Sequence, residues 1–448
     1  MKRMHMIIRL KQAISIYVLA SALSTTVTGC QHYFGTAHAA TYYVATTGDN
    51  SNPGTEDKPF RTIAHAVNAM VAGDTTYARG GTYIESAEVR FKRSGTSSAP
   101  IRLLNYPGET PTIRFTDRTN GTHRISLWNS GGYNKAVGWI VIEGFTITNS
   151  AVGIRLYSAN DVIIRGNTIY DNQYQGILGY GTRILVDRNV INHNGNFSGC
   201  AAGTVSCNKE HGIYMNGTAI TITNNVIYDN LSYGIQMNGS SSSVYDPSLH
   251  AGQEFAVSHN WIIANNTLAY NKYRAGIVVW GSTCNNARIE NNIFYENSRN
   301  VRGSANGIDY VGAGSATGIQ VRNNHFYASG LGGTASSTGT PPSDLVFTEN
   351  IVNISSPEFV NAPVELPASP NFALTPRSPA IDKGLPPSDE PPGETLRTAF
   401  KDALLKARRT DFAGTARPQG RAHDIGAYEY RTDGDAQSPT PVQSVQIR

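Results

Sequence analysis

The sequence has few charged residues, few cysteines and no long apolar run. Charged residues make up 16% of the 448, only four residues are cysteine, and 44 are glycine. The main apolar run, from Ala13 to Leu23, is too short to stay in a membrane as a spanning helix. The cysteines have no second ligand cluster beside them, which argues against a zinc site. Sparse charge and abundant glycine are instead typical of a chain wound into tight coils.

The formal net charge of +4 comes entirely from the first forty residues. They contain Lys2, Arg3, Arg9 and Lys11 and no acidic residue, so 33 basic and 33 acidic residues remain beyond them. A neutral chain of this kind gives no electrostatic reason to bind nucleic acid or an anionic surface. We therefore expect no nucleic-acid partner.

A basic start followed by a short apolar run predicts an export signal. Val27–Cys30 resembles a bacterial lipobox with Cys30 as the lipidated residue, and Ala37–Ala39 is a competing cleavage site. We favour the lipobox, because the second site lies far beyond the apolar run. Residues 1–40 are thus expected to be a signal and short linker. The mature protein would be extracytoplasmic, as an outer-membrane lipoprotein, periplasmic or secreted, touching the membrane only through a lipid on Cys30.

A short phrase recurs six times, as GNTIYDN, RNVINHN, NNVIYDN, NNTLAYN, NNIFYEN and NNHFYAS. Its second letters are Asn167, Asn189, Asn225, Asn266, Asn292 and Asn324. Self-similarity of this kind predicts a solenoid, and a unit of about 22 residues without helical period is one coil of a parallel β-helix. We expect each Asn to occupy a left-handed corner and its amide to hydrogen-bond from coil to coil.

Apolar residues alternate around each Asn, as in Val162, Ile164 and Ile169, so one face of each strand is buried. A third strand of every coil opens with Gly-Ile, at Gly153, Gly176, Gly212, Gly234, Gly276 and Gly307. By alternation, the first and third residues after this glycine point inward, and the second and fourth point outward. The fold class predicted is all-β, a single-stranded parallel β-helix solenoid.

The coils are expected over residues 41–363, closed at the N-terminal end by a capping helix. This helix starts near Pro59 and carries Ile63, Ala66, Val67 and Met70 on one face. Residues 364–431 should form a C-terminal capping segment with a basic helix near 396–409. Residues 432–448 read as a disordered tail.

Two insertions, 195–208 and 240–254, interrupt neighbouring coils next to their Gly-Ile strands. Long loops on a rigid scaffold are where function usually lies. Cys200 and Cys207 both lie in the first insertion, and an oxidising compartment permits a disulfide that closes this loop.

The opening stretches YYVATTGDNSNPGTEDKPFRTI, DTTYARGGTY and SGTSSAPIRLLNYPGETPTI resemble the N-terminal part of the family-nine pectate lyases. The closing SPAIDKG and FAGTARPQGRAHDIGAYEY resemble the C-terminal segment of many exported bacterial β-helix proteins. This resemblance implies an exported right-handed parallel β-helix of the pectin-lyase-like superfamily. It does not imply one reaction, because the superfamily contains lyases, hydrolases, epimerases and non-catalytic proteins.

The calcium motif of those pectate lyases is missing. They hold calcium with an Asn-Ala-Asp-Gly stretch and an Asp-Asp pair one coil later. The matching stretches here are 208–212 (NKEHG) and 231–234 (LSYG). We therefore expect no cofactor. Calcium stays possible, although its usual carboxylates are absent.

The replacement residues suggest how a uronate polymer could be cleaved by β-elimination. That reaction needs a base, a group that neutralises the carboxylate, and an acid for the leaving oxygen. We assign His211 or Lys209 as base, Tyr214 as acid, and Arg274 with Gln236 to the carboxylate. Substrate-binding residues are expected around them: Tyr174, Tyr180, Glu210, Tyr233, Gln236, Tyr273 and Trp280. Coils stack about 4.8 Å apart, so successive turn residues should lie roughly 5 Å from one another.

The predicted function is a monomeric polysaccharide lyase acting on an acidic polysaccharide. A glycoside hydrolase needs two carboxylates about 5 to 10 Å apart, and Glu210 has no carboxylate neighbour in the adjacent coils. A uronate epimerase would use the same base and acid as a lyase. A non-catalytic, glycan-binding surface protein also fits, since polar turn residues are often merely solvated. Convergence of Lys209, His211, Tyr214 and Arg274 would favour an enzyme.

Overall fold

The computed structural model describes residues 39–129, 135–198, 209–239, 257–298, 306–328, 337–386 and 398–431. The export signal with Cys30, the cysteines Cys200 and Cys207, and the C-terminal tail lie outside the described residues. No helix in the described ranges is long and apolar enough to cross a membrane.

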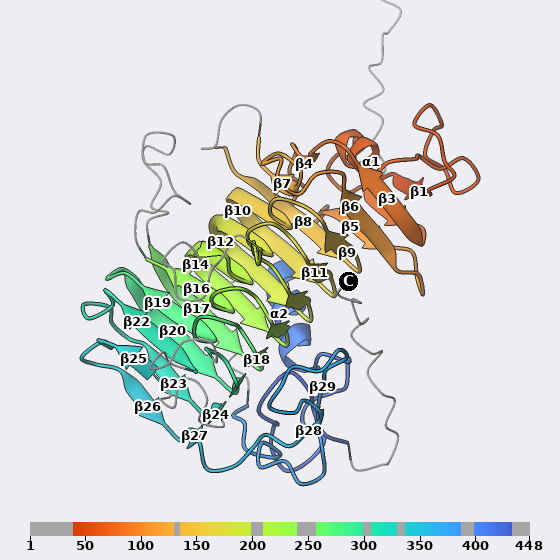
Figure 1. Cartoon of the computed structure of the whole chain (residues 1–448). Coiled ribbons are helices and arrows are strands. Elements are labelled where there is room, and N and C mark those ends of the chain that lie inside the picture. Colours follow the sequence, from red (N-terminus) through yellow and green to blue (C-terminus); the bar gives the residue numbers. More distant parts are fainter. Residues whose placement is uncertain are drawn as a thin grey trace, which may run out of the picture. The chain divides into compact units, whose positions relative to one another are not determined.

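The described strands stack as successive coils and pair in parallel along two sheets (Figure 1). In the described ranges, the larger sheet has 17 strands: β1 (Thr41–Val44), β2 (Thr75–Ala78), β4 (Val89–Phe91), β5 (Ile101–Asn105), β7 (Ile125–Leu127), β8 (Val137–Glu143), β10 (Ile154–Arg165), β12 (Ile177–Asp187), β14 (Ile213–Thr223), β16 (Ile235–Asn238), β17 (Ser258–Ala264), β19 (Ile277–Trp280), β20 (Cys284–Glu290), β22 (Ile308–Val311), β23 (Gln320–Arg322), β25 (Ser337–Gly339) and β26 (Val346–Thr348).

The second sheet is built from short strands, one from each coil. Its ten described strands are β3 (Gly81–Glu85), β6 (Pro111–Phe115), β9 (Thr146–Thr148), β11 (Thr168–Tyr170), β13 (Val190–Asn192), β15 (Val226–Tyr228), β18 (Thr267–Ala269), β21 (Ile293–Tyr295), β24 (His325–Tyr327) and β27 (Ile351–Val352). An antiparallel pair, β28 (Phe359–Asn361) and β29 (Asn371–Leu374), follows the coils. The prediction of an all-β, right-handed parallel β-helix is confirmed.

The alternation of apolar residues fills the interior as predicted. Val162, Ile164 and Ile169 are fully buried, and so are Ile213 and Met215, the first and third residues after one Gly. Such residues from successive coils stack into one continuous apolar core. Because each coil buries its apolar face only against its neighbours, the stack stabilises the strands that a single coil could not hold.

A short helix covers the N-terminal end of this core. It is α1 (Ile63–Ala69), and its residues Ile63, Ala66 and Val67 are buried. The side chain of Thr62 accepts a hydrogen bond from the backbone N–H of His65 and so caps the first turn. The predicted capping helix is therefore present.

The repeated asparagines form the expected ladder, but not in the expected backbone conformation. Asn225 Oδ1 accepts the side-chain Nδ2 of Asn189 at 3.0 Å, and Asn225 Nδ2 donates to Asn266 Oδ1 at 2.9 Å. The left-handed residue is the one before, as at Arg188 (φ 54) and Asn224 (φ 56). Our prediction of a left-handed Asn was wrong, because the chain bends one residue earlier and leaves the amide free to point inward.

A second ladder runs parallel to the first and was missed from the sequence. It is made by the Asn that ends five of the six phrases, and Asn194 Nδ2 donates to Asn230 Oδ1 at 2.9 Å. Asn172 and Asn271 continue it on either side. The short strands β11, β13, β15, β18 and β21 are thus each bounded by two buried columns of hydrogen-bonded amides.

The larger sheet has two outer faces, because its long strands bend at one left-handed residue. The bend lies at Asp161 in β10, Arg183 in β12 and Ala219 in β14, all with φ between 54 and 57. The strands opening with Gly-Ile form one face, which we call the site face. The strand segments after the bend form the other, which we call the helix face, because α2 (Thr398–Arg408) packs on it.

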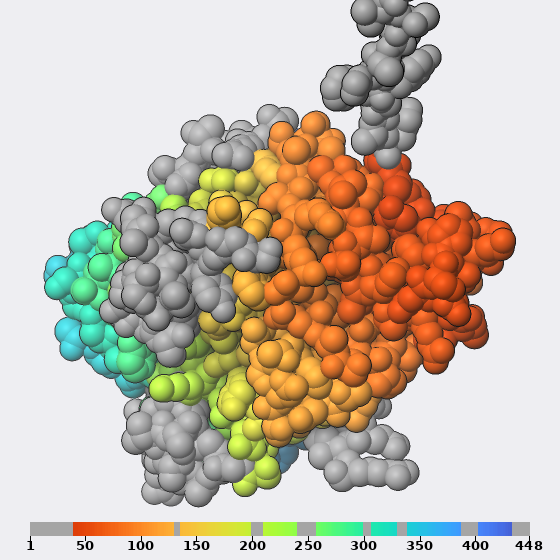
Figure 2. Space-filling model, turned by 90° about the horizontal axis from the view of Figure 1, so that it is seen from above, coloured from red at the N-terminus to blue at the C-terminus, as the bar shows by residue number. Residues whose placement is uncertain are grey.

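The C-terminal segment covers much of the outside. Leu404 and Ala407 of α2 pack against Leu185 on the helix face. Phe372 and Ile425 pack with Tyr228 on the outer face of the second sheet. Figure 2 shows the coils following one another in chain order, from the red and orange N-terminal coils to the green and cyan ones. The site face is the outer face that carries the predicted functional residues.

Candidate functional site

The register of the coils arranges the outward residues of the site face in two columns. In the first column Tyr214 on β14 is paired with Gln236 on β16, and further strands add Val278 and then Asp309. The second column contains Tyr180, Asn216, Asn238 and Trp280. The predicted outward direction of Tyr180, Tyr214, Gln236 and Trp280 agrees with this register, since their strand neighbours fill the core.

The aromatic residues of the site face are more deeply buried than we expected. Tyr180 is fully buried, Tyr214 is 7% exposed and Tyr233 is 3% exposed. Tyr180 and Tyr214 pack against each other, with Tyr157 and Leu178 at their edge. An open stacking platform is therefore not formed by these three rings, because side chains from neighbouring coils close over one another.

Three predicted binding residues remain accessible. Tyr174 is 42% exposed, and Tyr273 and Trp280 are half-buried. Trp280 packs at the edge of a small cluster formed by Tyr233, Ala275 and Val278. Of the expected stacking residues, these three offer ring surface to a ligand.

His211 lies at the centre of the site face. It is fully buried, its Nδ1 accepts the backbone N–H of Tyr233 at 3.3 Å, and the rings of Tyr214 and Tyr233 lie 5.3 and 5.4 Å away. The Nε2 atom makes no hydrogen bond of good geometry, although the Gln236 side chain lies beside the ring. A buried polar atom left in this state points to a functional role.

The surroundings keep the imidazole of His211 neutral. Burial lowers its pKa to about 3, the nearby Gln236 side chain opposes that shift, and the positive charge of Arg274 adds to it. In this neutral ring Nδ1 accepts the Tyr233 N–H, so the ring hydrogen is on Nε2, which is a buried donor without a good partner.

The buried carboxylate of Asp309, which we had not placed in the site, holds Tyr233. The Tyr233 hydroxyl donates to Asp309 Oδ2 at 2.8 Å, and the Thr338 hydroxyl donates to the other oxygen of the same carboxylate. Burial raises the pKa of Tyr233, the charge and hydrogen bond of Asp309 raise it further, and Arg274 lowers it. Asp309 lies two coils beyond Tyr233, and the long Tyr233 side chain spans the distance between these coils.

Buried amide side chains continue the polar residues beside His211. Gln236 Nε2 donates to Asn238 Oδ1 at 3.1 Å, and Asn238 Nδ2 donates to Asn216 Oδ1 at 3.0 Å. Uncharged donors and acceptors of this kind suit sugar hydroxyls and carboxylates equally. Asn216 and Asn238 were also missed, although each is the fourth residue after the glycine of its Gly-Ile strand, a position expected to point outward.

Lys209 and Glu210, in the turn before the Gly-Ile strand, have different surroundings. Lys209 is exposed, and its carbonyl accepts the side chain of Gln175. Glu210 is buried, and its carboxylate accepts the backbone N–H of Asn196 at 2.5 Å. Burial raises the pKa of Glu210, while that hydrogen bond and the charge of Arg118 oppose the shift. Glu210 thus anchors the start of an insertion rather than facing a ligand.

The turn residues do not fit a calcium ion. Calcium takes six to eight oxygen ligands, several of them carboxylates. At the positions that match the calcium motif, the carboxylate in the described residues is that of Glu210, already bound to Asn196, and one coil on stand Ser232 and Tyr233. Within the described ranges, no three His, Cys, Asp or Glu residues are grouped to hold a metal. We derive no step through calcium.

Two family models match the chain. Residues 42–196 match "Pel9A-like, right handed beta helix region", and residues 123–326 match "Right handed beta helix region". Together these two matches run through the coils that carry the site face.

Curated relatives and a solved structure agree with these matches. An uncharacterized protein of Bacillus subtilis (strain 168), YwoF, is 27% identical over 68% of this chain and 66% of its own length. Pectate lyase PEL9 of Emericella nidulans is 43% identical, over 17% of this chain and 18% of its own. The crystal structure of pectate lyase Pel9A aligns with a TM-score of 0.53 at 15% identity, over 89% of this chain and 98% of that one. The aligned part is just under two thirds of the first relative and under a fifth of the second.

Proposed function

Since the chain is a right-handed parallel β-helix protein of the pectin-lyase-like kind, we propose that its site face cleaves an acidic polysaccharide by β-elimination. One observation carries the proposal. A buried, neutral imidazole with an unsatisfied Nε2 lies among a tyrosine, an amide and the cation of Arg274. The names of the two pectate lyases similar to this chain support a uronate as the substrate class.

The residues take roles that balance the reaction. Lys209 Nζ, in its unprotonated form, removes the proton next to the uronate carboxylate, and the electron pair left behind forms a carbon–carbon double bond. The bond to the neighbouring sugar's oxygen breaks, and the Tyr214 hydroxyl donates a proton to that oxygen. Arg274, Gln236 and the Nε2–H of His211 hold the carboxylate, because the proton on the adjacent carbon becomes acidic only when the carboxylate charge is neutralised.

The low pKa of His211 keeps the ring neutral, so it acts on the uronate carboxylate as a hydrogen-bond donor. Asp309 and Tyr233 act as positioning residues, since Tyr233 supplies the backbone N–H that holds Nδ1. Because Nδ1 accepts that bond, the hydrogen of the neutral ring is on Nε2, which is the atom that donates to the substrate. Lys209, which is exposed in the preceding turn, is the base of the proposal.

We also propose that the protein works outside the cytoplasm. Polymers of uronate are outside the cytoplasm, and the expected export signal with a lipid on Cys30 would bring a monomer to them. Globomycin treatment of expressing cells tests the lipid, because a lipidated precursor accumulates when its signal peptidase is blocked.

The test of the reaction mixes purified protein with a panel of uronate polymers, with and without chelator. A lyase gives the ultraviolet absorbance of an unsaturated product, and here we expect that signal to persist in chelator. New reducing ends without absorbance would replace the proposal with hydrolysis. Altered uronate stereochemistry without chain cleavage would replace it with epimerisation, and retention on a polymer without any reaction would replace it with binding alone.

A further inference from the structure

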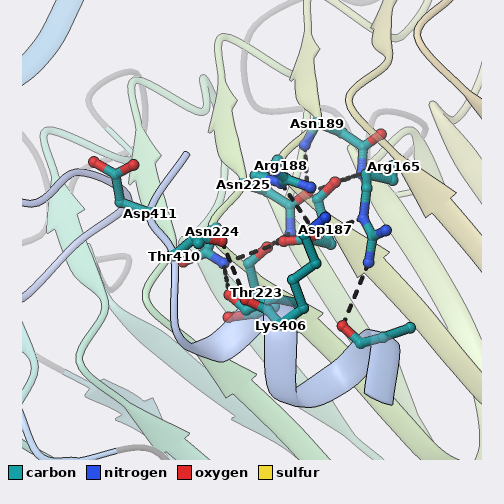
Figure 3. Close-up of polar contacts among 12 residues, drawn as sticks. Arg165, Asp187, Arg188, Asn189, Thr223, Asn224, Asn225, Lys406, Thr410 and Asp411 are labelled. Atoms are coloured by element: carbon teal, nitrogen blue, oxygen red, sulfur yellow. Dashed lines mark hydrogen bonds and ion pairs between the residues drawn. The ribbon is translucent and has the colours of Figure 1, made fainter. Parts of the chain in front are cut away.

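The helix face carries a cavity that the proposed reaction does not use. It has a volume of about 350 Å³ and lies between β5, β8, the second half of β10 and helix α2. Its walls include Arg102, Trp139, Glu143, Arg165 and, from the helix, Ala403. Figure 3 shows Arg165 beside Asp187 with α2 next to them. The volume is at the lower end of the range for small-ligand pockets, about 300–1,000 Å³.

Trp139 holds a backbone conformation that its side chain disfavours. Its φ is 56, at the bend where later coils have, in order, Asp161, Arg183, Ala219, Asn260, Asn286 and Gly318, all with positive φ. The coil demands a left-handed residue here, which Asn, Asp and Gly accept most easily and a bulky aromatic residue accepts poorly. Trp139 is half-buried, and it lines the cavity.

Two of the four charges in the cavity are already neutralised. Asp161 accepts two hydrogen bonds from Arg183, at 2.7 and 3.0 Å, and Arg165 donates to Asp187 at 2.8 Å. The other two are less engaged. Arg102 donates a long bond of 3.5 Å to the Pro100 carbonyl, and in the described part of the chain the Glu143 carboxylate has no partner.

We propose that this cavity is a second carbohydrate site, which binds an uncharged sugar unit against Trp139. The flat indole offers an apolar surface to one face of a sugar ring. The Glu143 carboxylate accepts sugar hydroxyls and the Arg102 guanidinium donates to them. Because these two charges cancel, the cavity lacks the net positive charge that would select a uronate. The site would hold a neutral part of a polymer while the site face acts elsewhere, and it does not depend on the reaction proposed there.

Trp139→Asn and Glu143→Gln test the proposal. Asn occupies the same bend at Asn260 and Asn286, so Trp139→Asn removes the ring and relieves the backbone. Titration calorimetry with cellobiose, xylobiose and galactobiose, and with digalacturonate as the charged counterpart, measures binding to the full chain. We expect saturable binding of a neutral disaccharide that weakens at least about tenfold in both variants. Asn260→Ala, at the same bend farther along, should bind as the wild type does.

Measurements of thermal stability and of cleavage distinguish a binding role of Trp139 from a structural one. Trp139→Asn should keep or raise the midpoint of thermal unfolding, and cleavage of a short uronate substrate should not change. Absence of binding to every neutral disaccharide, tighter binding of digalacturonate, or binding that survives both substitutions would each overturn the proposal. A lowered unfolding midpoint in Trp139→Asn with normal binding in Glu143→Gln would assign Trp139 a packing role instead.

Discussion

Two kinds of residue column run along this molecule, and they differ in how completely their polar atoms are used. The Asn ladders repeat one residue from coil to coil, and each amide is hydrogen-bonded on both sides. The columns of the site face change residue in every coil, from Tyr214 to Gln236 to Val278 to Asp309. His211 lies beside these columns, and its buried Nε2 lacks a good hydrogen-bond partner.

The comparison shows how a repetitive fold separates structure from function. Where one side chain satisfies the same backbone groups in every coil, the repeat stabilises the stack and has no capacity left for a ligand. Where the side chains differ, neighbouring coils place unlike groups about 4.8 Å apart, which is how a reactive constellation can arise. The two columns should therefore respond to substitution in opposite ways.

The largest expected effect is on catalysis. His211→Gln and Tyr214→Phe should each lower the rate of uronate cleavage by about 10²–10⁴-fold, the usual effect of losing a general acid or a donor that stabilises developing charge. Glutamine is chosen because His211 is fully buried and alanine would leave a cavity. Initial rates, with circular dichroism to verify folding, give the result. Folded variants with wild-type rates would remove the site face from the reaction.

The next effect is on stability. Asn225→Ala deletes amide bonds to Asn189, Asn266 and the Val186 carbonyl and leaves buried groups unsatisfied. We expect a loss of about 2–5 kcal/mol in the free energy of unfolding, measured with denaturant. The matched control is Asn286→Ala, an exposed residue at a bend where another coil has Ala219, and it should cost no more than about 1 kcal/mol, the strain of alanine in a left-handed conformation. Equal losses in both would mean that the ladder adds nothing specific.

The third prediction is that His211, unlike the Asn ladders, makes the stability of the protein depend on pH. The pKa of His211 is about 3 in the folded chain and 6.5 when exposed, so below about pH 6.5 the unfolded chain binds a proton that the folded chain does not. The wild type should lose about 1.4 kcal/mol of stability per pH unit relative to His211→Gln as the pH falls from there toward 3.

The pH effect of His211 is measured as a difference between wild type and variant because Glu429 also titrates. Burial raises the pKa of Glu429 to about 7, and its titration changes stability with the opposite sign. Subtracting the His211→Gln curve from that of the wild type cancels Glu429. The same subtraction for Asn225→Ala should give no slope with pH, because no titrating group is removed. Parallel curves for wild type and His211→Gln would show that the imidazole is not held neutral.

The smallest effect is expected at the edge of the site. Tyr233→Phe removes the hydroxyl bond to Asp309 but keeps the backbone N–H that holds His211. We expect a stability loss of about 1–2 kcal/mol and a fall in kcat with little change in KM, because Tyr233 only positions His211. Asp309→Asn should behave in the same way if the carboxylate acts through Tyr233. A raised KM with unchanged kcat would instead place Tyr233 among the groups that touch substrate.

The fold could be predicted closely because its rules are local. Alternation placed Ile164, Ile169 and Met215 inside, and the recurring phrase gave the length of a coil. The amphipathic stretch from Ile63 gave the cap. One backbone detail failed, since Arg188 rather than Asn189 takes the left-handed conformation, and sequence alone does not say which side of a corner bends first.

The candidate site could be predicted only as a list of residues on one face. The sequence brought His211, Tyr214, Gln236 and Arg274 to neighbouring coils, since coil spacing fixes that distance. It did not show that Tyr180 and Tyr214 close over each other, nor that Glu210 turns away to hold Asn196. Side-chain length and rotamer control those contacts, and neither follows from the repeat.

By itself the sequence determined the winding of the chain, because each strand's apolar period and each coil's asparagines act within one or two coils. Only the tertiary structure decided how Asp309 reaches Tyr233 and how α2 and Trp139 enclose a cavity on the other face. Those contacts join residues two coils apart, or a residue of the coils with a helix of the C-terminal segment. Their formation depends on packing across the molecule, which no local pattern encodes.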